Sequence, residues 1–369
     1  MGMGYQGFCR FYQAGPATDA MILLTTGSSV NMVLEPMFST SVWGAGWYNA
    51  ASSANYADAA LRYEGSIDFE MQANSEMWDL MGDWIINNRA YPKSLDISPD
   101  GARVYQYRTT GAYGGNYDLN GAWNTSAGFS TSEGSFVTVS AGVIALDRTE
   151  VNPNGGAASA TAFSDFTYIK QKTGVVTGNC NTFSDAIFPL NPSGTNVNPI
   201  PFWRTNADLL RGTYSAPFSG GVAPQTGLET VEWSVDVTQN QILLYTCNGT
   251  RLPTALLQGP MDVTGSLVLF HVDGVFDPVT GPDASGTITS PYMYAENTWF
   301  RVTIARGADP SVYIEVPATV VESDDYGIQG NDSVTNRTFG IKGLGGRCNS
   351  AVTLPPVIMS NSAGAFVAP

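Results

Sequence analysis

Apolar and polar residues alternate with a period of two over much of this chain. In residues 231–238 and 300–305, every second residue is apolar. Successive side chains of a β-strand point to opposite faces, so this pattern predicts strands with one buried face. Similar runs, most of them bounded by Gly, Pro, Asn or Asp, cover 65–71, 135–146, 265–272 and 311–316. The chain is therefore predicted to be mainly β.

One segment has helical spacing instead. Between residues 75 and 88, apolar side chains including Trp84 and Ile85 recur every three or four positions, and Glu76, Asp79 and Asp83 fall on the other side. This pattern is typical of an amphipathic helix with one buried face. We expect a single helix here that covers one mouth of a β-sandwich.

Three short segments recur in the same order about 200 residues apart. Residues 29–32 match 234–237 at an offset of 205, residues 64–69 match 264–269 at an offset of 200, and residues 134–138 match 331–335 at an offset of 197. Each match lies in a region with strand patterning. Together they indicate a duplicated β domain.

The repeats and the distribution of Pro, Gly and Asn divide the chain into five parts. Between the repeats, a stretch of low charge is dense in these turn residues and also contains aromatic residues, which indicates an irregular connector packed on the domains. The predicted parts are an N-terminal arm (1–19), a first β domain (20–150), the connector (151–209), a second β domain (210–346) and a C-terminal arm (347–369).

Composition and charge exclude several classes of protein. Only 13% of the 369 residues are charged and 40 are Gly, which argues against a coiled coil or a helical bundle. The net charge of -15 and the small number of lysines disfavour a protein that binds nucleic acid tightly. We find no signal-peptide pattern and no apolar run of about 20 residues, so membrane insertion is not expected. The four cysteines are scattered and are expected to be free thiols: Cys9, Cys180, Cys247 and Cys348.

Candidate chemistry is sparse. The single histidine, His271, precedes Asp273 by two residues, but no nucleophile-elbow motif accompanies them. Two acidic runs, one around Asp273 and one at 322–325, lack the spacing of a calcium loop and are expected to cap turns. Asp68 and Glu70 share one strand face and could form a glycosidase pair, although a solvated acidic surface explains them more simply. We therefore predict no enzymatic activity, no cofactor and no metal site.

The order of the predicted strands resembles that of the tail tube proteins, or major tail proteins, of long-tailed, non-contractile bacteriophages. In the second half, the similarity lies in 232–237, in the loop from Tyr245 to Pro253 and in the V-T-G-S-L strand at 263–267. The first half is similar through 26–29, 64–67 and 134–140, and the connector through 199–205. One departure is that Gly and Pro after Val272 leave the second half with a short or missing helix.

The resemblance implies a fold, an assembly and a function. Each half would be a tail-tube β-sandwich or barrel domain with a flanking helix, and copies would join their sheets into a ring with a continuous inner β-barrel. A duplicated chain would form rings of three that mimic sixfold symmetry. Stacked rings would form a virion tail tube, assembled in the bacterial cytoplasm, through which DNA leaves the capsid. The implied partners are further copies of the chain, the tail tip and tail terminator proteins, and DNA in transient, non-specific passage.

Particular residues carry this interpretation. Glu64, Asp68 and Glu70 are candidates for the channel wall, and Val235 and Leu267 are candidate residues of the ring-forming strands. The acidity of the chain has two explanations, which are a channel that repels DNA and a surface that stays soluble. A carbohydrate-binding or host-binding β-sandwich of a phage tail or cell surface is the alternative function, and a hydrolase is a third.

Overall fold

The computed structural model confirms a mainly β chain. It describes residues 8–13, 20–23, 25–38, 56–71, 81–86, 105–110, 116–151, 167–171, 174–177, 199–211, 229–247, 249–270, 298–306, 309–327, 336–345, 348–349, 352–353, 355–361 and 364–367. Almost all of these residues lie in antiparallel strands. The strands predicted from the period-two pattern are present, and most of them are longer than the alternating segments.

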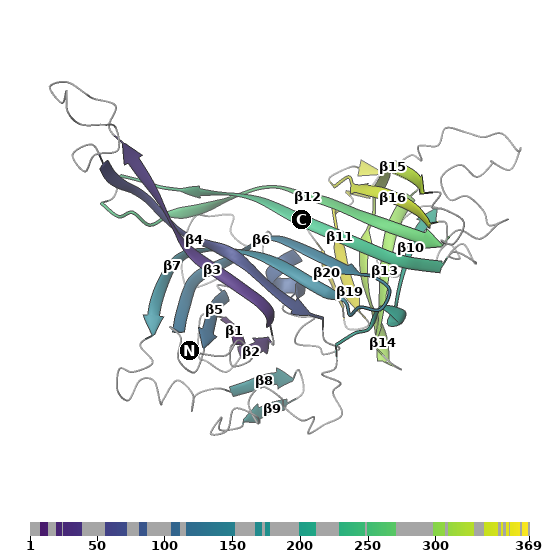
Figure 1. Ribbon diagram of the computed structural model, residues 1–369, viewed down its shortest axis with the longest axis horizontal. Helices are drawn as coiled ribbons and strands as arrows, with labels where there is room; N and C mark the ends of the chain where they lie inside the picture. The colour runs from purple at the N-terminus through teal and green to yellow at the C-terminus, as the bar shows by residue number, and fades with distance from the viewer. Residues whose placement is uncertain are drawn as a thin grey trace, which may run out of the picture.

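A long antiparallel sheet is the main feature of the molecule (Figure 1). Eight of its strands follow one another across the sheet in the order β3-β4-β7-β6-β11-β12-β16-β15. The sheet also branches at β6 into β5, β1 and β2. The bounds of the eight are β3 Thr25–Phe38, β4 Tyr56–Glu70, β6 Asn116–Thr131, β7 Thr138–Val151, β11 Glu229–Leu244, β12 Ala255–Phe270, β15 Thr319–Gly327 and β16 Asn336–Gly343.

The remaining elements are shorter. A second sheet has the order β10-β13-β14-β19-β20, and β8-β9 and β17-β18 are separate hairpins. The bounds are β1 Phe8–Gln13, β2 Ala20–Leu23, β5 Tyr105–Thr110, β8 Thr167–Gln171, β9 Gly174–Thr177, β10 Thr205–Arg211, β13 Thr298–Arg306, β14 Asp309–Val316, β17 Cys348–Asn349, β18 Val352–Thr353, β19 Ile358–Asn361 and β20 Gly364–Val367, with a π-helix η2 Met81–Ile86 and a 3₁₀ turn η4 Phe202–Arg204.

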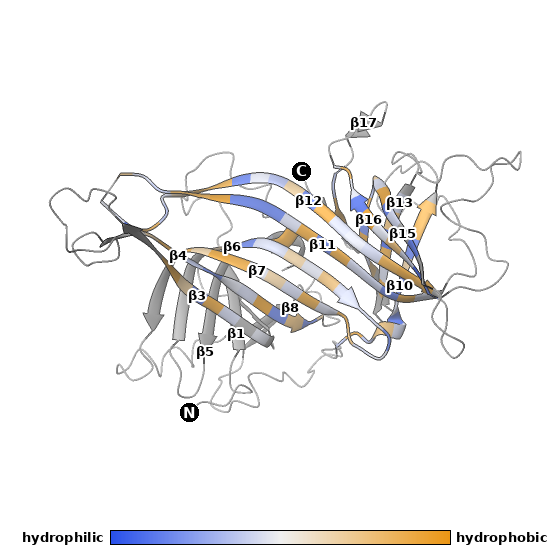
Figure 2. Cartoon of the chain, turned by 45° about the horizontal axis from the view of Figure 1, so that its top comes forward, coloured by the Kyte–Doolittle hydropathy of each residue, from blue (hydrophilic) through white to orange (hydrophobic). Residues whose placement is uncertain are grey.

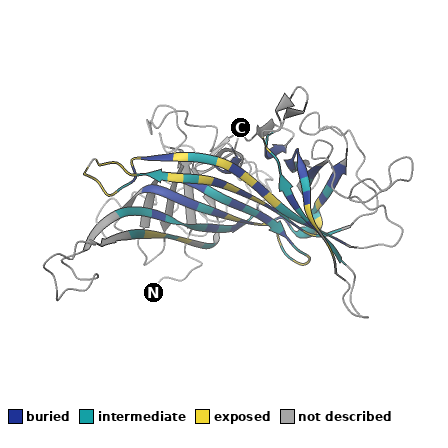
Figure 3. Cartoon of the chain, turned by 90° about the horizontal axis from the view of Figure 1, so that it is seen from above, coloured by how far each residue is buried: buried dark blue, intermediate teal, exposed yellow. Residues whose placement is uncertain are grey.

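Alternation along the strands gives the main sheet one apolar and one polar face. The apolar face belongs to one continuous core, which also contains Trp84 of η2 and apolar residues of the second sheet such as Val302 and Ile314. We call the opposite face the polar face; on β4 and β11 it carries the even-numbered residues from Arg62 to Glu70 and from Glu232 to Asn240. Buried and exposed residues alternate along β11 and β12 in Figure 3, and the hydropathy in Figure 2 alternates with them.

The two halves of the main sheet have the same strand order and the same registers. In the first half, one row across the strands β3, β4, β7 and β6 consists of Ser29, Ser66, Gly142 and Ser126. In the second half, β11-β12-β16-β15 places in the corresponding row Ser234, Ser266, Gly340 and Ser323. The residue types agree in all four strands, and the offsets along the chain run from 197 to 205.

Irregularities of the two halves coincide as well. The register of β3 against β4 shifts between Thr25 and Gly27, and that of β11 against β12 shifts between Thr230 and Glu232, which is 205 residues later in both cases. Gly65 and Gly265 lie at equivalent positions, and a Cβ at either would collide with the carbonyl oxygen of a serine in the adjacent strand, Ser29 or Ser234. Shared bulges and shared close approaches are features of a common backbone plan.

One sequence expectation needs correction. Glu322, Asp324 and Asp325 lie in β15 and not in a turn. Asp324 and Asp325 pair with Phe339 and Thr338 of β16, and Glu322 is the bulge residue between the paired Val321 and Ser323. The helix expected at 75–88 is confirmed in its described part, the π-helix η2, in which Trp84, Ile85 and Ile86 are buried; its other residues lie outside the described ranges.

The division of the chain into five parts stays a prediction. The expected connector boundary at 209/210 falls within β10, which pairs with β13. Both expected arms contain strands, since β1 lies in the first and β19 pairs with β14 of the same chain. A short or missing second helix after Val272 lies outside the described residues.

Candidate functional site: an edge-to-edge junction and the polar face

The two halves of the main sheet meet edge to edge inside the chain. Strand β6 of the first half pairs antiparallel with β11 of the second, from Ser126 opposite Thr238 to Thr131 opposite Trp233. At the centre of this junction, Phe129 faces Val235 and Gly128 faces Asp236. Phe129 and Val235 are both at most 1% exposed, so the core passes through the junction without a break.

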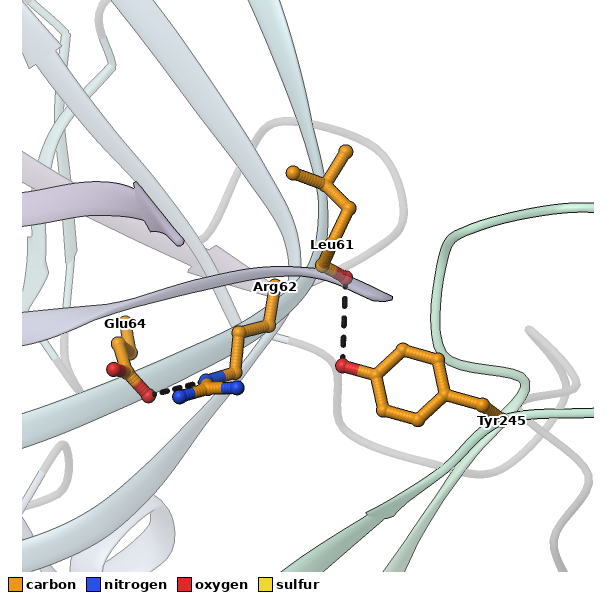
Figure 4. A network of polar contacts seen from close by, with 4 residues as sticks. All are labelled: Leu61, Arg62, Glu64 and Tyr245. Carbon is orange, nitrogen blue, oxygen red and sulfur yellow. Dashed lines mark hydrogen bonds and ion pairs between the residues drawn. The ribbon is translucent and has the colours of Figure 1, made fainter. Parts of the chain in front are cut away.

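The hairpin formed by β11 and β12 extends beyond the junction and holds the first half. Figure 4 shows Tyr245 reaching β4, where its hydroxyl donates to the Leu61 carbonyl at 3.5 Å. The Leu61 amide donates to the Arg251 carbonyl at 3.0 Å, and the Arg62 Nε donates to Glu64 Oε2 at 2.8 Å. Burial raises the pKa of the Tyr245 hydroxyl, and the hydrogen bond to Glu64 raises the pKa of Arg62. The tyrosine therefore stays a neutral donor and the arginine stays charged at neutral pH.

Further contacts lie under the same hairpin. The Gln239 side chain donates to the Ile85 carbonyl in η2, and the Gln241 side chain donates to the Asn124 carbonyl in β6 at 2.7 Å. A small apolar cluster joins Leu256 of β12 to Trp123 and Ile144 of the first half. The two halves are thus held by a backbone ladder, by side-chain hydrogen bonds and by apolar contacts.

The polar face runs across the junction without a change in character. Rows of small hydroxyl residues, glycines and acids cross the strands, and neighbouring hydroxyls bond to each other, as in Ser234 to Ser266 at 2.9 Å and Ser130 to Thr138 at 3.1 Å. One such row contains Gly27, Asp68, Ser140, Gly128, Asp236, Thr264 and Lys342. Most of the side chains on this face are short and polar.

Acids outnumber bases among the described residues of this face. Its two described cations are each close to a glutamate, Arg62 to Glu64 and Lys342 to Glu322 at 4.0 Å. Burial raises the pKa of Asp236, because removal from water penalises the carboxylate form.

The predicted site residues fall into two groups. Glu64, Asp68 and Glu70 all lie on the polar face of β4. Asp68 accepts a hydrogen bond from Ser140 at 2.5 Å, whereas Glu64 is paired with Arg62. Val235 and Leu267 lie in β11 and β12 and are buried in the core of their own chain, at 0% and 1% exposure. The alternation of apolar and polar residues did not predict that β6 pairs with β11. The order of the repeats along the chain was the sequence feature that pointed to this junction.

The outer edges of the eight-stranded run are β3 and β15. Within the described residues, each of them pairs with one neighbour only. Met32 of β3 and Val237 of β11 occupy equivalent positions in the two halves. Met32 is 52% exposed and Val237 is 1% exposed, since Val237 has β6 beside it and Met32 has no described strand there.

The described residues contain no group of three or more metal-ligating side chains, and His271 and Asp273 lie outside the described ranges. Cys247 is an exposed free thiol, and the other cysteine side chains are outside the description. None of the described helices is long and apolar enough to cross a membrane.

Comparison with known proteins gives only slight similarity to solved structures. No protein-family model matches the chain, and no curated protein matches it. Among solved structures, the SPP1 tail tube, determined by solid-state NMR and cryo-EM, is similar at a TM-score of 0.23 and 11% identity, over 37% of this chain and 72% of that chain. At this TM-score the similarity is too slight to argue from.

Proposed function

We propose that this chain is a structural virion protein, without enzymatic activity, that polymerises into stacked rings and forms the tail tube of a long-tailed phage. Its partners are then other copies of itself, the tail tip and terminator proteins at the ends of the tube, and DNA during ejection. The tube is assembled in the bacterial cytoplasm and resides in the virion tail. The sequence resemblance to tail tube proteins leads to this proposal, and the internal architecture supports it.

The observation that carries the proposal is the junction between β6 and β11. It joins two four-stranded units of the same order, edge to edge, into one sheet with a continuous core. The edges left at the ends, β3 and β15, are the counterparts of the two edges that are joined inside. Head-to-tail contacts that repeat one operation close into a ring or continue as a helix. One chain therefore already contains one copy of the edge-to-edge contact that such an assembly repeats.

A ring of three chains gives a closed sheet with a wide channel. Three eight-stranded runs make a barrel of about 24 strands, and barrels of 16 to 18 strands already leave an aqueous channel. Closure also removes the unpaired edges, which otherwise invite aggregation. The domain duplication on which the ring of three depends is supported by the matching registers and bulges of the two halves.

The polar face is the side of the sheet that suits the channel. Short hydroxyl side chains and an excess of acids present few groups that bind phosphate, since phosphate binding needs clustered Lys and Arg. Asp68 and Glu70 lie on this face, and Arg62 and Lys342 are held by glutamates. In this arrangement Glu64 contributes less free charge than Asp68 and Glu70, because Arg62 neutralises it.

Electron microscopy of the purified chain in negative stain tests the proposal directly. We expect tubes of uniform width with a central channel, built from stacked rings. A chain that stays monomeric over a wide range of concentration and ionic strength would contradict the proposal.

The alternative, a carbohydrate-binding or host-binding module, has one observation in its favour. Trp203 is 65% exposed, although Arg204 lies 4.9 Å from the centre of its ring. This alternative predicts a monomer or small oligomer whose glycan binding is lost in Trp203→Ala.

A further inference from the structure

We propose that the outer edges β3 and β15 of neighbouring copies pair with each other in the register of the internal junction, with Asn31 of one copy opposite Asp325 of the next. The inference rests on the proposed function and adds what that function leaves open, namely which strands meet and at which residues. The partner is a second copy of this chain.

The register follows from the two repeats. Strand β11 maps onto β3 by subtracting 205, as Ser234 and Ser29 show, and β6 maps onto β15 by adding 197, as Ser126 and Ser323 show. Inside the chain, Asp236 lies opposite Gly128. Applying the two offsets to this pair gives Asn31 opposite Asp325. The same mapping places Ser29 opposite Gly327 and Val33 opposite Ser323.

Exposure on β3 indicates that no strand of the described residues covers this edge. Val235 and Val237 of β11 are 0% and 1% exposed. Their counterparts in β3 are Val30, which is half-buried, and Met32, which is 52% exposed. The sequence therefore places apolar residues on the core face of an edge strand, where a neighbouring strand would cover them. Val30 already packs against the edge of the core, so the core can continue into a second copy as it continues through the internal junction.

Charge on the two edges is compatible with this register. β15 carries the acids Glu322, Asp324 and Asp325, and the facing segment of β3, residues 29–33, carries no charge. Like charges directly opposite each other destabilise a strand pair, and this register has none over these residues. The Asn31 side chain is exposed and can donate to the Asp325 carboxylate across the junction.

A disulfide across the proposed pair tests the register. The variant is Asn31→Cys with Asp325→Cys in the full chain, with the four native cysteines, Cys9, Cys180, Cys247 and Cys348, replaced by Ser. Directly opposed residues have Cα atoms about 4.5–5.5 Å apart, within the range of a disulfide. The two positions cannot bridge within one chain, because seven strand spacings of about 4.8 Å separate β3 from β15.

Two matched variants serve as controls. Gly128→Cys with Asp236→Cys occupies the equivalent pair of the internal junction, and a Cβ at Gly128 would meet only Asp236 side-chain atoms within 4 Å. This pair should form a disulfide inside one chain. Ser29→Cys with Ser323→Cys shares the polar face, but the proposed register separates the two by four residues, or about 13 Å, and should not cross-link.

After mild oxidation of assembled material, we expect the Asn31/Asp325 pair to give covalent multimers on a non-reducing gel that a reductant converts to single chains. The internal pair should stay a single chain with a disulfide detectable by mass. If tubes form but this pair does not cross-link, or the Ser29/Ser323 pair does, the register is overturned and the proposed function stands. If no copies associate at all, the proposed function itself fails.

Discussion

Replacing Met32 by serine should weaken assembly and lower the stability of the free chain by only about 1 kcal/mol, because about half of this side chain is already covered there. Full burial of a methionine side chain is worth about 1.5–3 kcal/mol. Met32 is 52% exposed in the isolated chain, so covering it at a junction adds roughly half of that value, or about 1 kcal/mol. Since 1.4 kcal/mol is a factor of ten, the association constant of each junction should fall about fivefold.

The repeat supplies a matched comparison. Val237 is the counterpart of Met32 and is 1% exposed, so Val237→Ser should lower the free energy of unfolding of the free chain by about 2–4 kcal/mol, through lost burial, a cavity and a buried hydroxyl. Urea unfolding of unassembled protein measures stability, and pelleting of tubes across a concentration series gives the critical concentration. The reasoning is refuted if Met32→Ser leaves the critical concentration unchanged, or if it destabilises the free chain as strongly as Val237→Ser.

Three further predictions concern the core and the polar face. Val235→Asp or Leu267→Asp should unfold the chain, because an unpaired charge would enter its own core at a cost of several kcal/mol; a folded, soluble variant by circular dichroism would contradict this. Asp68→Lys with Glu70→Lys should leave tubes intact and slow DNA ejection at low salt, with the delay shrinking as salt is added; ejection at the parental rate in low salt would move both residues to the outside of the tube. Asp236 has a raised pKa, so the folded chain holds its proton more tightly than the unfolded chain, and this stabilising contribution is lost as pH rises through the folded pKa. Asp236→Asn should therefore raise the unfolding midpoint at pH 7 and change it little near pH 3, and an equal rise at both values would argue against burial as the cause.

Local patterning predicted the strands because one face of each strand is buried. The segments 65–71 and 300–305 alternate since Ile67 and Phe300 face the core and their neighbours face away from it. Matches between short segments also pointed to a repeat, and their offsets of 205 and 200 reappear in the registers of the serine rows. The third match, between residues 134–138 and 331–335, gave an offset of 197. The equivalent glycines of β7 and β16, Gly142 and Gly340, are 198 residues apart, so this offset was one residue too small for these two strands. An insertion of one residue between paired strands leaves no mark on local alternation.

Local patterns in the sequence could not predict the junction or the hairpin contacts. Phe129 and Val235 are more than 100 residues apart, and nothing in the alternation around either residue specifies its neighbour across the sheet. Alternation also could not separate residues buried inside the chain, such as Val235 and Leu267, from residues buried only between copies. The exposure of Met32 makes that distinction, and it depends on which strands lie at the edges.

The internal junction also changes how an assembly of this kind begins and how it can diversify. Contact between β6 and β11 forms as one chain folds, so it does not depend on protein concentration and avoids the loss of translational and rotational freedom, estimated at about 4–15 kcal/mol, that each encounter of separate molecules entails. In a ring of three, half of the six edge contacts are made in this way, which lowers the number of collisions needed for a closed nucleus. A single gene also fixes equal numbers of the two halves. Each half is then free to acquire its own outer loops, and a tube with a sixfold inner wall can present a threefold exterior.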